Sequence, residues 1–85
     1  MNNQNEDFSN LKRPIHPMPV FVEEALKERG LMEEYEARPA YQRNDYIGWI
    51  NRAKREETKK KRLNRMLDEL EKGNVYMKMK WDPPL

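Results

Sequence analysis

The chain has 85 residues, of which 38% are charged and 36% are hydrophobic, and its formal net charge is +2. A chain of this length has room for one small domain with a thin core. Its mean hydropathy is −1.23, and no apolar run approaches the roughly 20 residues that a membrane-spanning helix needs. The sequence contains no cysteine, which excludes disulfides, thiolate zinc sites and a cysteine nucleophile. Residues 1–10 lack the basic and apolar stretches of a secretory signal, so we expect a soluble, cytoplasmic protein without membrane insertion.

The net charge conceals two blocks of opposite sign. Residues 20–36 hold six acidic and two basic residues, a balance of −4. Residues 52–65 hold eight basic and two acidic residues, a balance of +6. An electrostatic partner is therefore expected to meet the second block first.

The amino-terminal part of the chain is predicted to be a tail followed by a helix. Residues 1–18 are polar and contain two prolines, so we expect a disordered or loosely docked tail. Pro19 suits the start of a helix, and apolar residues then recur at helical spacing from Phe21 to Leu26. Gly30 is expected to end this helix.

Two further helices are predicted in the middle of the chain. Residues 31–37 are expected to form a short helix. This helix is expected to stop near Arg38, because Pro39 disfavours helical geometry just before it. The next helix starts at Pro39 or at Asn44, and both starts remain open. Its buried face is predicted from the i, i+3, i+4, i+7 spacing of Tyr46, Trp49, Ile50 and Ala53.

The last long helix is predicted over residues 56–72, with Gly73 as its carboxy-terminal cap. Its apolar stripe consists of Leu63, Met66, Leu67 and Leu70. Residues 75–81 alternate between apolar and polar side chains, as a strand does, but no partner strand is recognisable. We therefore expect residues 74–85 to be an extended segment, either packed on the helices or free.

These elements predict an all-α fold, a small bundle of three to four helices over residues 19–73, with flexible N-terminal and C-terminal tails. A thin core is expected from the apolar stripes of the helices. Its predicted members are Phe21, Leu26, Tyr35, Tyr46, Trp49, Ile50, Ala53, Leu63, Met66, Leu67 and Leu70.

One segment resembles the YdeI/OmpD-associated (OmdA) family, which carries the pattern Tyr-x-x-Trp-Ile-x-x-Ala-Lys-x-x-Glu-Thr-x-x-x-Arg. The resemblance covers roughly residues 18–73 and departs from the family at Arg29-Gly30, where an Asn-Pro is common. It implies a helical domain and, by name, an association with bacteriocin protection and with an outer-membrane porin. The matching positions are Tyr46, Trp49, Ile50, Ala53, Lys54, Glu57, Thr58 and Arg62.

Most motif side chains are interpreted as structural. Trp49 and Tyr46 are read as core residues in preference to an aromatic ligand shelf. The polar members are read as a network at the start of the last helix. In that network Glu57 and Thr58 serve as the cap and as partners for Arg62 or Lys54.

We assign no catalytic, cofactor-binding or metal-binding residue. No activated nucleophile or base is recognisable in the sequence, and the single histidine, His16, has no second soft ligand. We therefore expect a non-enzymatic interaction module of the YdeI/OmdA type without a cofactor, and its partner is expected to be another protein. The resemblance implies a link to bacteriocin or stress tolerance in bacteria.

The alternative function is weak binding of nucleic acid through residues 52–65. Lysines that follow one another in a helix spread around it at about 100° per residue, which is typical of a solvated face. Two acids at the start of the helix would also face phosphate groups, which disfavours this alternative. The candidate basic surface consists of Arg52, Arg55, Lys59, Lys60, Lys61 and Arg65.

Overall fold

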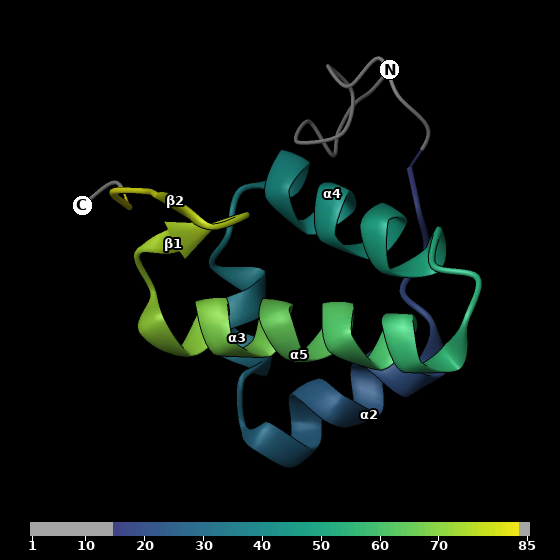
Figure 1. Cartoon of the computed structure of the whole chain (residues 1–85). Helices are drawn as coiled ribbons and strands as arrows, with labels where there is room; N and C mark the ends of the chain where they lie inside the picture. The colour runs from purple at the N-terminus through teal and green to yellow at the C-terminus, as the bar shows by residue number, and fades with distance from the viewer. Residues whose placement is uncertain (1–14, 84–85) are drawn as a thin grey trace, which may run out of the picture.

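The structure, a computed structural model of the chain, describes residues 15–83 (Figure 1). The described residues form four helices followed by a short hairpin of two strands. The predicted helical fold is therefore confirmed in its main part, but the hairpin was not predicted. The elements are α2 (Val20–Arg29), α3 (Met32–Glu36), α4 (Ala40–Asn51), α5 (Glu56–Lys72), β1 (Val75–Tyr76) and β2 (Met79–Lys80).

The helix ends lie where the glycines and prolines predict them. α2 ends at Gly30, which has a φ of 67° and so adopts the left-handed conformation that glycine tolerates best. α5 ends at Gly73 in the same way, with a φ of 82°. α4 begins directly after Pro39, which decides between the two starts that the sequence left open. Local chemistry therefore sets at least one end of each of the three long helices.

α5 runs through the middle of the fold, between α4 on one side and α2 on the other (Figure 1). α3 also packs against α5, and the hairpin lies beside its carboxy-terminal end. The buried core forms where these elements meet α5. It consists of Val22, Leu26, Leu31, Tyr35, Tyr46, Ile47, Ile50, Met66, Leu67 and Leu70.

The predicted core is largely confirmed, with three differences. Trp49 and Leu63 are only half-buried and pack against the core from its edge. The prediction for Phe21 is wrong, because 37% of this residue is exposed. On α2 the buried stripe is made by Val22 and Leu26, which are four residues apart and share one face of the helix. The eight predicted residues that are buried are Leu26, Tyr35, Tyr46, Ile50, Ala53, Met66, Leu67 and Leu70.

The prediction of an unpaired extended segment after residue 74 is wrong. β1 and β2 pair in antiparallel fashion, with Val75 opposite Lys80 and Tyr76 opposite Met79. The turn residues Met77 and Lys78 both have positive φ, 50° and 69°, as a two-residue type I′ turn requires. Glycine or asparagine usually fills these positions, so this sequence carries no recognisable hairpin pattern.

A buried arginine fastens the hairpin to the helices. Arg38 is only 4% exposed, and its Nη2 donates hydrogen bonds to the carbonyl oxygens of Glu69 (3.0 Å) and Val75 (2.9 Å). Its Nη1 donates to the amide oxygen of Gln42 at 2.9 Å, and its guanidinium lies 4.7 Å from the ring centroid of Trp81. Arg38 therefore ties α4, the end of α5 and both sides of the hairpin together.

Part of the predicted amino-terminal tail lies against α4. The backbone N–H of His16 donates to the side-chain oxygen of Asn44 at 2.7 Å, and Met18 packs against the core. The His16 ring occupies the space beside Gly48, where a Cβ atom would come within 2.7 Å of it. Residues 1–14 and 84–85, for which tails were also predicted, lie outside the described residues. Within the described part of the chain, no helix is both long and apolar enough to span a membrane.

Candidate functional site

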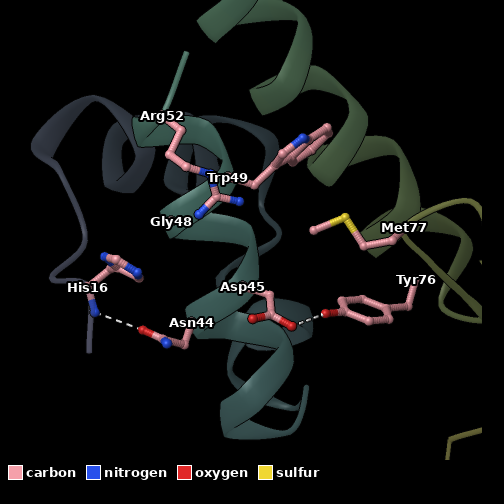
Figure 2. Close-up of a pocket in the computed structure, with 8 residues that line it drawn as sticks. All are labelled: His16, Asn44, Asp45, Gly48, Trp49, Arg52, Tyr76 and Met77. Carbon is pink, nitrogen blue, oxygen red and sulfur yellow. Dashed lines mark hydrogen bonds between the residues drawn. The ribbon is translucent and has the colours of Figure 1, made fainter. Parts of the chain in front are cut away.

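One hollow in the described structure, which we call the α4 pocket, has a volume of about 570 Å³. It opens in front of α4, with the amino-terminal segment on one side and the hairpin on the other (Figure 2). Three parts of the chain that are distant in sequence therefore build one site. The pocket is lined by His16, Asn44, Asp45, Gly48, Trp49, Arg52, Tyr76 and Met77.

α4 supplies one continuous face of the pocket. Asp45, Gly48, Trp49 and Arg52 follow one another at i, i+3, i+4 and i+7, a spacing that places side chains along one side of a helix. Figure 2 shows the Arg52 side chain directed along this face toward Gly48. Gly48 carries no side chain, so the His16 ring can lie close to the backbone of α4 at this point.

The hairpin supplies the opposite wall through Tyr76 and Met77 (Figure 2). The Tyr76 hydroxyl donates a hydrogen bond to the Asp45 carboxylate. The ring of Tyr76 packs edge-on against Tyr46 and Tyr41, with centroid distances of 5.5 and 5.9 Å. Burial, together with the hydrogen bond to Asp45, raises the pKa of Tyr76 well above its usual range. Tyr76 is therefore a neutral hydrogen-bond donor at physiological pH.

Trp49 is held in place by two arginines of α5. The guanidinium groups of Arg62 and Arg65 lie 5.4 and 5.9 Å from the centroid of its ring, within the range of cation–π interactions. Arg62 also donates a hydrogen bond of 2.6 Å to the backbone oxygen of Trp49. Carbonyl groups in the last turn of a helix lack partners within the helix, and Arg62 supplies one here.

The network predicted at the start of the last helix is therefore wrong. Arg62 bonds to α4 and not to Glu57 or Thr58. No side chain caps α5 at Arg55, and Glu57 makes only a long, exposed ion pair of 4.0 Å with Arg55. Tertiary packing takes Arg62 away from its sequence neighbours, because α4 and α5 meet at this corner.

The other motif residues divide between the core and the surface. Tyr46, Ile50 and Ala53 are buried, whereas Lys54 is exposed and Thr58 half-buried. The Tyr46 hydroxyl donates to the Glu69 carboxylate, and burial together with this hydrogen bond raises the pKa of Tyr46. The motif therefore contributes mainly to structure, with Trp49 as its one member in the pocket lining.

The residues of the candidate basic surface do not form one compact site. Arg52 belongs to the α4 pocket, and Arg65 lies over Trp49. Lys59 lies 6.0 Å from the ring centroid of Phe21, beside Lys60 in a different hollow. The last two members, Arg55 and Lys61, are exposed.

Sequence reasoning missed most of the α4 pocket. The sequence does contain one signal for the pocket, the i, i+3, i+4, i+7 spacing of Asp45, Gly48, Trp49 and Arg52. This set is shifted by one residue from the predicted buried stripe of α4, which starts at Tyr46. Tyr76 and Met77 could not be placed, because their position depends on the hairpin. Within residues 15–83 there is no cluster of three or more histidine, cysteine or carboxylate side chains suited to a metal ion.

Comparison with known proteins gives one match. A family model described as "Bacteriocin-protection, YdeI or OmpD-Associated", named OmdA, matches residues 16–73. The matched range includes α2 to α5 and His16, and it ends before the hairpin. No curated protein and no solved structure matches the chain. Since the family model covers more than half of the 85 residues, the chain belongs to the OmdA family.

Proposed function

We propose that this chain is a non-enzymatic interaction module that binds another protein through the α4 pocket. The proposal rests on four side chains that meet around this pocket. α4 and its carboxy-terminal cap supply Trp49 and Arg52, and the hairpin supplies Tyr76 and Met77. Tryptophan, tyrosine, arginine and methionine are the residue types enriched at the centres of protein interfaces. Their meeting around one open hollow supports a binding site.

The site is also held rigid before a partner arrives. Arg62 and Arg65 hold Trp49, and the hydrogen bond between Tyr76 and Asp45 joins the two walls of the pocket. Binding to side chains that are already ordered costs less conformational entropy than binding to mobile ones. This arrangement supports recognition of a partner by a preformed surface.

The chemistry of the pocket favours binding over catalysis. A general base must give and take a proton near the working pH. The raised pKa of Tyr76 moves this hydroxyl away from that range, and the Asp45 carboxylate accepts a hydrogen bond from it. Both groups are therefore suited to orienting a bound partner.

The description of the family gives the biological setting of the proposal. It names bacteriocin protection and association with OmpD, and we place the protein partner in one of these processes. A bacterial strain that produces the chain is then expected to survive a bacteriocin challenge better than the same strain that produces the Arg52→Ala variant.

Affinity capture with matched variants tests the binding site. Wild-type chain is expected to retain a protein partner that Arg52→Ala and Met77→Ala both lose. The control variant Lys72→Ala changes an exposed residue in the last turn of α5 that does not line the pocket, and it is expected to retain the partner. Circular dichroism establishes that all variants are folded. Equal capture by all four proteins would contradict the assignment of the pocket, and capture of nucleic acid alone would contradict the proposed class of partner.

A further inference from the structure

A second hollow, which shares no lining residue with the α4 pocket, lies where the first turn of α2 faces the first half of α5. We call it the Phe21 groove, and its volume is about 470 Å³. Its floor and walls come from both helices. It is lined by Phe21, Glu56, Lys59, Lys60 and Leu63.

The groove contains apolar surface that the fold leaves unused. Phe21 is 37% exposed, and the neighbouring Val20 is 67% exposed. The core does not need either side chain, because Val22 and Leu26 form the buried stripe of α2. Leu63 is half-buried and continues the apolar surface across to α5. Removing apolar surface from water favours association, so this surface can contribute to binding.

The rim of the groove is positively charged. Lys59 and Lys60 both line it, against a single acidic residue, Glu56. Lys61 is the next residue of α5 and is exposed. These three lysines form no ion pair with another described residue, so their charges are not neutralised within the described part of the chain.

From this combination we infer that the Phe21 groove binds an acidic segment of a partner protein, in which glutamate or aspartate residues flank a phenylalanine or another large apolar residue. The apolar side chain packs between Phe21 and Leu63, and the flanking carboxylates pair with Lys59 and Lys60. A hollow of about 470 Å³ accommodates one or two side chains, which suits a single anchor residue. The inference goes beyond the proposed function, because it assigns a different surface.

Apolar contact distinguishes this site from a simple basic patch. A patch that recognises charge alone binds polyanions of any kind and loses them as salt increases. The lysine stems contribute apolar contacts of their own, so part of the binding energy at the groove does not depend on salt. An acidic peptide therefore needs its apolar residue as well as its carboxylates.

Fluorescence anisotropy with three labelled peptides tests both requirements. The first peptide has one central phenylalanine flanked on both sides by glutamates. In the second peptide serine replaces the phenylalanine, and in the third glutamine replaces every glutamate. Each replacement is expected to weaken binding by about tenfold or more. Equal binding of all three peptides would overturn the inference.

Variants of the chain locate the site. The double variant Lys59→Gln, Lys60→Gln and the variant Phe21→Ala are each expected to weaken binding of the first peptide by about tenfold. The double variant Lys78→Gln, Lys80→Gln removes two exposed lysines of the hairpin and is expected to bind as the wild type does. The lysine variants leave the core intact, so the result does not depend on whether Phe21→Ala folds.

Three controls test whether a membrane, a nucleic acid or a second copy of the chain occupies the groove instead. Vesicles containing anionic phospholipid and a duplex DNA oligonucleotide are titrated under the same conditions, and sedimentation measures self-association. We expect weaker binding of both probes than of the first peptide, and a monomer at micromolar concentration. Tighter binding of vesicles or DNA through the same lysines, or a dimer that Phe21→Ala dissociates, would assign the groove to a different occupant and reject the acidic segment.

Discussion

The hydroxyl of Tyr46 donates a hydrogen bond to the carboxylate of Glu69, and this buried pair joins α4 to α5 beside the hairpin. The same carboxylate accepts the backbone N–H groups of Met77 (2.8 Å) and Lys78 (2.9 Å), the two residues of the hairpin turn. Through this turn the pair also sets the position of Tyr76, which forms one wall of the α4 pocket. Tyr46 belongs to the family motif and does not line the α4 pocket. Its hydrogen bond to Glu69 nevertheless helps to position the hairpin wall of that pocket.

Removing the Glu69 carboxylate is expected to destabilise the fold. Glu69→Ala leaves the Tyr46 hydroxyl and the backbone N–H groups of Met77 and Lys78 without their acceptor, and we expect a loss of about 3 kcal/mol in the free energy of unfolding. The matched control is Glu71→Ala, two residues further along α5, which breaks only an exposed ion pair with Arg29. That control is expected to lose less than about 1 kcal/mol. Urea denaturation measures both, and equal losses would contradict the role given to Glu69.

Glycine at the second turn position is expected to stabilise the hairpin. Lys78 has a φ of 69°, a conformation that costs about 1–2 kcal/mol for residues other than glycine. Lys78→Gly removes this strain and is expected to raise stability by up to about 1 kcal/mol, after the loss of chain entropy is subtracted. Lys80→Gly lies in β2 and is expected to lower stability by about 0.5–1 kcal/mol. Thermal denaturation compares the two, and changes of the same sign would contradict the turn assignment.

Stability is expected to fall at high pH because of buried tyrosines. Burial raises the pKa of Tyr35 from its ordinary value of 10.0 to about 12, so the folded state holds this proton more tightly than the unfolded state does. The contribution of Tyr35 to stability is therefore complete below about pH 10 and is lost between about pH 10 and 12, by about 1.4 kcal/mol per pH unit.

The variant Tyr35→Phe cannot ionise at this position, so its stability is expected to decline less steeply over the same interval. Urea denaturation of the variant and of the wild type at several pH values gives the difference, in which the titration of the lysines cancels. Parallel curves for the two proteins would show that Tyr35 is not the cause.

Ile50 is expected to matter more to stability than Trp49. Ile50 is completely buried, and Ile50→Ala is expected to cost about 3–4 kcal/mol. Trp49 is half-buried at the edge of the core, and Trp49→Ala is expected to cost about 2 kcal/mol. Circular dichroism during thermal denaturation ranks the two variants. The reverse order would place Trp49 at the centre of the core, where the sequence pattern had put it.

Nucleic acid is expected to bind only weakly. The cations of residues 52–65 do not form one compact surface, because Arg65 lies over Trp49 whereas Lys59 and Lys60 line the Phe21 groove. α5 also opens with Glu56 and Glu57, which repel phosphate groups. We expect binding of duplex DNA to disappear near about 150 mM salt. Fluorescence titration at two salt concentrations measures this. Submicromolar affinity at about 150 mM salt that a folded Lys59→Glu, Lys60→Glu, Lys61→Glu variant loses would contradict the expectation.

The helices and the family could be predicted because both depend on residues that are close together in the chain. Pro19 and Pro39 restrict the backbone locally, whereas Gly30 and Gly73 permit the left-handed conformation that ends a helix. All four therefore mark helix ends whatever packs around them. The apolar stripe of α5 could also be predicted, because polar residues occupy the remaining sides of this helix. The motif from Tyr46 to Arg62 is likewise contained in one short segment.

The orientation of α4 and the hairpin depended on contacts between distant residues. Apolar side chains occur around much of α4, so packing against α5 decided that Ile47 is buried and that Trp49 lies at the edge. Met77 and Lys78 have no intrinsic preference for a type I′ turn, and the carboxylate of Glu69 supplies the hydrogen bonds that hold them there. The α4 pocket forms only when this turn brings Tyr76 to Asp45. These two residues are 31 positions apart in the sequence, so no local pattern could predict their hydrogen bond.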